Sequence, residues 1–127
     1  MTHVVDNSIL HFEHKSWKNE LLFWEDEIKT FKNRVKEIED RWTDDLVLAE
    51  LGQYERFFEK QLKRIALMKA DIETHEHNIA DHVDNHNDAV DRIGYLYHME
   101  MRENLNAQRT IYQELKRRFF TFLGKYF

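Results

Sequence analysis

Apolar side chains recur along the first third of the chain at spacings that alternate between four and three residues. The series is Trp17, Leu21, Trp24, Ile28, Phe31, Val35, Ile38 and Trp42. Charged side chains occupy most positions between them, which is typical of a helix with one face packed against partner helices. Extending the spacing backwards reaches His14 and Leu10, and Ser8 can cap a helix that starts there. The pattern therefore predicts a helix over about residues 8–42.

Two further series with the same spacing follow. The second comprises Leu51, Tyr54, Phe58, Gln61, Ile65, Met68, Ile72, His75, Ile79, His82 and His86, and the third comprises Gly94, His98, Met101, Leu105, Gln108, Tyr112, Leu115, Phe119, Phe122 and Tyr126. Residues that favour turns and helix caps stand at both breaks between the series, at 43–45 and 85–88. We predict helices over about residues 46–85 and 88–124. The alternative is a single helix over 46–124 that pairs with another chain.

Three long helices with short connections favour an up-down-up arrangement, because a short connection places consecutive helices antiparallel. We therefore predict an all-α fold, a long antiparallel three-helix bundle with coiled-coil-like heptad packing, as one domain over residues 1–127 that can dimerise. The composition agrees with this fold, since the chain has no Pro and only three Gly. It also has no Cys, which excludes disulfides, thiolate metal sites and a Cys nucleophile.

The charge and the hydropathy exclude other classes of protein. The formal net charge is −5, which does not indicate a nucleic-acid surface. No apolar stretch approaches the roughly 20 residues that span a bilayer. The first residues have neither the basic region nor the apolar region of a signal peptide. We therefore expect a cytoplasmic protein with no membrane span and no nucleic-acid partner.

The chain contains eight His, and all of them come before residue 99. If the chain folds back after the first helix and again after the second, residues equally distant from each turn lie at one level. His14, His75 and His98 then share a layer, beside Gly94, whose small size leaves room. The same register stacks the other layers as Trp17 with Ile72 and Met101, Leu21 with Met68 and Leu105, Trp24 with Ile65 and Gln108, and Phe31 with Phe58 and Leu115.

Three imidazoles that converge in a bundle core can bind a transition metal such as Zn, Cu, Ni or Fe, or less favourably a haem. His82 and His86 are four residues apart on one helix, a spacing that brings two imidazoles onto one ion. Residues 71–91 hold seven acids and no Lys or Arg, so their field attracts cations. Side chains that could add a ligand or accept a ring proton are Glu13, Glu73, Glu76 and Tyr97.

Other interpretations of the polar heptad positions stay open. A histidine in a core is commonly hydrogen-bonded to a neighbouring Glu or Tyr without any metal. A cluster of His also titrates near neutral pH, so it can act as a pH-responsive element. Gln61 and Gln108 are polar positions within apolar runs, and a buried amide of this kind typically specifies helix register.

The sequence contains no Gly-rich phosphate loop, no nucleophile elbow and no His-Glu-x-x-His motif, so an enzyme is not favoured. We predict a non-enzymatic helical-bundle binding protein with a His-lined transition-metal site at one end of the bundle. The alternative is a structural or protein–protein interaction module that acts as a homodimer or with a helical partner, without a cofactor. A small enzyme that uses a metal-bound water is a third hypothesis. Aromatic and basic residues outside the heptad series mark a candidate partner surface: Phe23, Phe57, Phe120, Phe127 and Lys116 to Arg118.

Overall fold

The computed structural model describes residues 7–86 and 92–127, with side chains described over 8–78 and 92–127. It contains three helices, α1 (Asn7–Glu39), α2 (Asp45–His86) and α3 (Arg92–Tyr126). No strand is present in these ranges, so the predicted all-helical fold with three helices is confirmed. Within the same ranges, no helix has an apolar segment long enough to cross a membrane.

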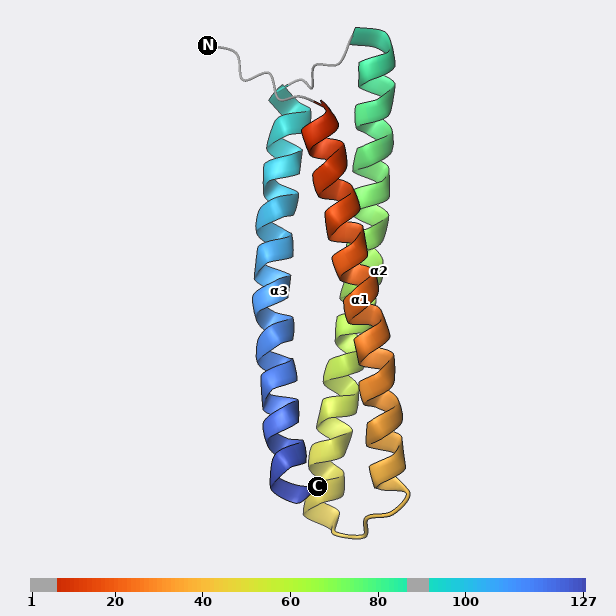
Figure 1. The fold of residues 1–127 in the computed structure, drawn as a ribbon, viewed down its shortest axis with the longest axis vertical. Coiled ribbons are helices and arrows are strands. Elements are labelled where there is room, and N and C mark those ends of the chain that lie inside the picture. Colours follow the sequence, from red (N-terminus) through yellow and green to blue (C-terminus); the bar gives the residue numbers. More distant parts are fainter. Residues whose placement is uncertain (1–6, 87–91) are drawn as a thin grey trace.

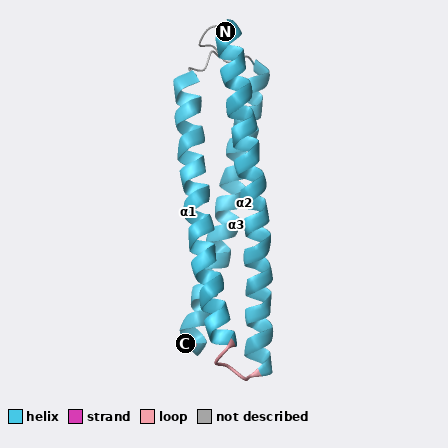
Figure 2. Ribbon diagram, turned by 90° about the vertical axis from the view of Figure 1, so that its right-hand side faces the viewer, coloured by secondary structure: helices cyan, strands magenta, loops and turns pink. Residues whose placement is uncertain are grey.

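The three helices lie lengthwise beside one another (Figures 1 and 2). The start of α1, the end of α2 and the start of α3 lie together at one end of the molecule, which we call the histidine end (Figure 1). Towards the opposite end, the Tyr54 hydroxyl on α2 donates to the backbone oxygen of Arg118 on α3 at 3.2 Å. Because α2 and α3 contact each other, the alternative of a single helix over residues 46–124 is wrong.

The core consists of heptad positions from all three helices. Its buried apolar members include Trp17, Leu21, Trp24, Ile28, Val35, Ile38, Leu51, Phe58, Ile65, Ile72, Leu105, Tyr112, Leu115, Phe119 and Phe122. Each helix turns one face towards the other two, and removal of these faces from water is the main force that holds the helices together. The core therefore follows the spacing that the sequence shows.

Two helix ends differ from the prediction. α1 ends at Glu39 rather than near residue 42. Trp42 belongs to the heptad series but follows the helix, with its backbone N–H bonded to the Ile38 carbonyl at 2.9 Å and its ring 4.8 Å from that of Phe127. An aromatic side chain can thus reach the core from a turn, which the spacing alone does not distinguish from a helix. α3 continues to Tyr126, two residues beyond the predicted end.

The first break in the pattern is a helix cap, as predicted. The Asp44 carboxylate accepts hydrogen bonds from the backbone N–H groups of Leu46 at 2.9 Å and Val47 at 3.2 Å. These bonds satisfy donors that the first turn of α2 leaves free. At the second break, α2 runs to residue 86, and the rest of the predicted turn at 85–88 lies outside the described residues.

The layers of core residues predicted from the sequence agree with the contacts in the structure to within about one helical turn. Phe31 packs against Phe58 with ring centroids 5.6 Å apart, as predicted. Its ring neighbours on α3 are Phe119 at 5.5 Å and Phe120 at 5.4 Å, about one turn from the predicted Leu115. Gln61 and Gln108 were expected in adjacent layers, but the Gln108 amide donates to the Gln61 carbonyl oxygen. Both amides are buried, and this mutual bond fixes α3 against α2 at one position along the helices.

Candidate metal centre

His14, His75 and His98 come together in the core at the histidine end, one from each helix. Their side chains are buried, with relative exposures of 1%, 7% and 0%. The ring centroids lie 5.1 Å apart for His14 and His75, 4.9 Å for His14 and His98, and 5.7 Å for His75 and His98. One ring nitrogen from each lies within 4.8 Å of those of the other two. The predicted convergence of these three residues is therefore present.

Each nitrogen of the His14 ring has a different neighbour. Nδ1 bonds to the carboxylate of Glu76, which also holds the more exposed His11. Nε2 faces Nδ1 of His98 at 3.1 Å. Burial raises the pKa of Glu76, but the hydrogen bonds from His14 and His11 outweigh burial and lower it. Glu76 is therefore an ionised acceptor of a hydrogen bond from Nδ1 of His14, and in the His14 tautomer with its proton on Nδ1 the Nε2 atom carries the lone pair.

The His98 ring is arranged in the same way with its nitrogens exchanged. Its Nε2 donates to Glu13 at 3.0 Å, so Nδ1 carries the lone pair that faces His14. Arg102 fixes the Glu13 carboxylate, with its Nε 2.9 Å from Oε2. The pKa of Glu13 is lowered because the bonds from Arg102 and His98 outweigh the raising effect of burial. The Trp17 ring stacks on the His98 ring, with centroids 4.8 Å apart and an interplanar angle of 28°.

His75 has a buried nitrogen without a partner. Its Nε2 makes no hydrogen bond in the described part of the chain. Burial, with smaller contributions from the nearby His14 and His98, lowers the pKa of His75 to about 4. Burial also lowers the pKa of His98, against the effect of Glu13. Both rings are therefore neutral at pH 7, the form in which imidazole is a metal ligand.

The facing nitrogens of His14 and His98 lie at a separation that suits two ligands of one metal ion. When the outer nitrogens of neutral His14 and His98 donate hydrogen bonds to Glu76 and Glu13, the facing nitrogens of the two rings carry lone pairs 3.1 Å apart. Two such lone pairs repel unless a positive charge lies between them. Imidazole nitrogens bind zinc at about 2.0–2.1 Å, which places two ligands of a tetrahedral ion about 3.3 Å apart. The observed separation is close to that value.

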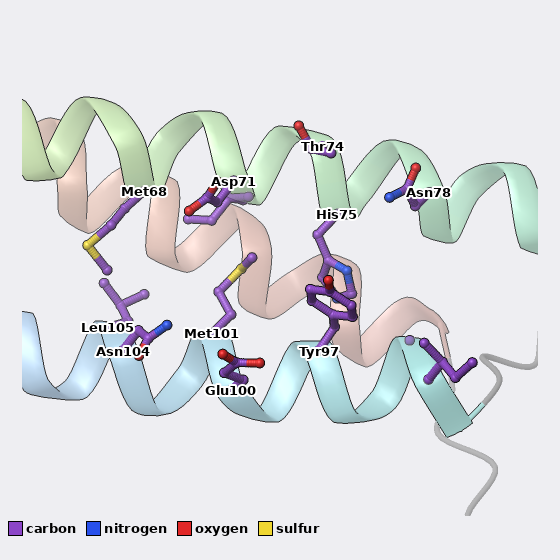
Figure 3. Close-up of a pocket in the computed structure, with 13 residues that line it drawn as sticks. Met68, Asp71, Thr74, His75, Asn78, Tyr97, Glu100, Met101, Asn104 and Leu105 are labelled. Carbon is purple, nitrogen blue, oxygen red and sulfur yellow. The ribbon is translucent and has the colours of Figure 1, made fainter.

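A groove between α2 and α3 reaches the centre from one side (Figure 3). Its volume is about 610 Å³, and His75 and Tyr97 line it. Gly94 also lines it, in agreement with the expectation that this small residue leaves room beside the histidine layer. The rings of His75 and Tyr97 lie 6.1 Å apart. The centre is therefore buried among the helices but approachable from the groove.

The remaining predicted site residues lie elsewhere or cannot be placed. Glu73 extends towards Lys18, with a nitrogen–oxygen distance of 3.6 Å. The side chains of His82 and His86 fall in residues 79–91, outside the described side chains. The roles of Arg102 and Trp17 were not predicted, although Arg102 stands one helical turn after His98 and Trp17 nearly one turn after His14. Their position one turn from a histidine on the same helix face is the sequence feature that could have indicated these contacts.

The basic residues near the end of α3 pair within the molecule. Lys116 bonds to Glu27 at 2.8 Å, while Arg118 bonds to Glu114 at 3.1 Å. Phe23, Phe57 and Phe120 are exposed, as expected for aromatics outside the heptad series. The candidate partner surface therefore consists mainly of its aromatic members, because the charges have partners already.

Comparisons of the chain with protein-family models, with curated proteins and with solved structures found no match.

Proposed function

We propose that this chain is an antiparallel three-helix bundle that binds one transition-metal ion through His14 Nε2, His98 Nδ1 and His75 Nε2. The observation that carries the proposal is the convergence of three buried imidazoles, one from each helix, with one ring nitrogen of each within 4.8 Å of those of the other two. Glu76 and Glu13 occupy the outer nitrogens of two of these rings, as carboxylates do around metal-bound histidines. A purely structural histidine cluster would satisfy the Nε2 atom of His75, which has no partner among the described residues.

The donor set suits a borderline transition metal. Three neutral imidazoles match Zn(II), Cu(II), Ni(II) or Fe(II), whereas Ca(II) and Mg(II) prefer oxygen ligands. We use zinc as the reference ion because it tolerates the four-coordinate geometry that three ligands and one further donor supply. The antiparallel arrangement is supported by contacts that join early residues of α1 to late residues of α2, such as His14 with Glu76.

The proposal is tested by metal content. Untagged protein is loaded with zinc, desalted and analysed for metal per chain, in parallel with His75→Leu and with His77→Leu. His77 is an exposed histidine on the same helix and serves as the matched control. We expect about one zinc per chain in the wild type and in His77→Leu, and little in His75→Leu, since loss of one of three ligands weakens binding steeply. Equal zinc in all three proteins would refute the assignment.

An interaction module without a cofactor is the second candidate function. It is supported by the exposed rings of Phe23, Phe57 and Phe120, because exposed aromatic residues are enriched in protein interfaces. A dimer mass in light scattering that persists with a chelator present would support this function. A monomer at micromolar concentration would count against self-association.

A further inference from the structure

The groove between α2 and α3 is lined by apolar and acidic side chains that access to the histidines alone does not require. Its floor is apolar, with Met68 and Ile72 from α2 and Met101 and Leu105 from α3. Figure 3 shows Met68 extending from α2, and Met101 and Leu105 from α3, into the space between the two helices. A volume of about 610 Å³ falls within the range of small-molecule sites.

The charged groups that line the groove are acidic. Asp71 on α2 and Glu100 on α3 line it, and no Lys or Arg is among the described residues that do so. Tyr97, which is 61% exposed, adds an aromatic face. Carboxylates and an aromatic face attract an organic cation, while the apolar floor accommodates its hydrocarbon part.

His75 also lines the groove; it is 7% exposed, and its Nε2 has no hydrogen-bond partner in the described part of the chain. His75 is also one of the three histidines of the candidate metal centre, so the groove and the centre share a side chain, and a donor atom in the groove can approach a metal held there. Asp71 precedes His75 by four residues on α2, which is about 6 Å along the helix axis. A chain of three methylene groups spans a distance of that order.

We propose that the groove binds a small organic cation that also carries a neutral nitrogen donor. The donor completes the coordination of the metal held by the three histidines, and the cationic group lies beside Asp71 and Glu100. This inference rests on the proposed metal function, since the donor needs an ion to bind. It adds the chemical class of the ligand and the residues that select it.

The test uses cobalt(II) as a spectroscopic substitute for zinc and three imidazoles that differ only in the charge of the tail. The probes are 1-(3-aminopropyl)imidazole, 1-butylimidazole and 3-(imidazol-1-yl)propanoate, with a cationic, a neutral and an anionic tail. The tail is on N1, so it points away from the donor N3 and cannot chelate the metal. Binding is followed by the visible cobalt spectrum, and retention of cobalt is checked after desalting.

We expect the cationic probe to bind about three- to tenfold more tightly than the neutral one, and the anionic probe to bind most weakly. Asp71→Asn with Glu100→Gln removes this preference but leaves cobalt binding and the affinity for 1-butylimidazole unchanged. Glu103→Gln, which replaces an exposed carboxylate outside the groove, is the matched control and keeps the preference.

Two outcomes would overturn the inference in different ways. If the protein binds cobalt but its affinity does not depend on the charge of the tail, the groove is not a cation site and the metal function stands. If the protein binds no cobalt, the metal function and the inference fail together. A preference that persists in the double variant would likewise remove Asp71 and Glu100 from the site.

Discussion

Replacing His75 with leucine gives the sharpest test, because a ligand and a structural residue respond in opposite directions. In the metal-free protein, Nε2 of His75 is buried without a hydrogen-bond partner in the described part of the chain. An unsatisfied buried polar atom costs about 1–3 kcal/mol. Leucine has a similar size and no polar atom, and an imperfect fit costs less than about 1.5 kcal/mol. We therefore expect metal-free His75→Leu to be more stable than the wild type by about 1 kcal/mol.

The assay is urea unfolding at pH 7 with a chelator present, followed by helical circular dichroism. A higher midpoint with an unchanged slope indicates a gain in stability rather than a change in the unfolded state. His98→Leu is the contrasting variant, because it removes the bond to Glu13 at 3.0 Å and the stacking on Trp17. We expect it to lose about 1–3 kcal/mol.

Two outcomes for the stability of His75→Leu distinguish a structural residue from a metal ligand. If metal-free His75→Leu loses more than about 1 kcal/mol, the buried nitrogen has a stabilising partner in solution, and the metal proposal loses its supporting observation. If His75→Leu is more stable without metal yet less stable than the wild type with zinc, the residue trades stability for binding, as functional residues commonly do.

Three further predictions concern pH, metal and the groups around the ligands. The pKa of His75 is about 4 in the folded protein and near 6.5 in the unfolded chain, so stability is fully present above pH 6.5 and is lost as the pH falls towards 4. Metal-free wild type should lose about 2–3 kcal/mol more than His75→Leu between pH 7 and pH 4.5, measured by urea unfolding; equal losses would contradict the shift. Free zinc at a hundred times its dissociation constant should stabilise the wild type by about 2.7 kcal/mol and raise the melting temperature by roughly 10 °C, and calorimetry should show no such rise in His75→Leu. Arg102→Met should weaken zinc binding about tenfold because it releases the Glu13 carboxylate that orients His98. Arg109→Met removes a similar Arg–Glu pair between α3 and α1 with bonds of 3.0 and 3.1 Å, and in titration calorimetry it should bind zinc like the wild type.

Much of the fold follows from the sequence because the heptad spacing is regular and the breaks are marked by polar residues. The core residues and the Asp44 cap are recovered from that spacing and from those breaks. The end of α1 was misplaced because Trp42 packs on Phe127, a contact between residues far apart in the sequence that no local pattern encodes. The order of layers was correct only to within about one turn, since aromatic side chains reach neighbouring levels.

The three central histidines were predictable because each occupies a heptad position and two turns determine their level. The groups around them were harder to predict. Arg102 holds the Glu13 carboxylate, and Glu13 in turn accepts a hydrogen bond from His98. The role of Arg102 therefore appears only when α1 and α3 are placed side by side. The unpartnered nitrogen of His75 is a property of the packed core, and no sequence pattern distinguishes it from a satisfied histidine.

The three candidate ligands come from three different helices, and the first two are separated by the only described connection, the turn that follows α1. No two of them are close in sequence, so the unfolded chain offers the ion no preformed pair, and assembly of the helices must precede tight binding. A bound ion would join parts of α1, α2 and α3 that are far apart along the chain. In a protein with no cysteine, it would act as a reversible cross-link, able to hold α1 to the other helices after cleavage of the peptide chain near Thr43.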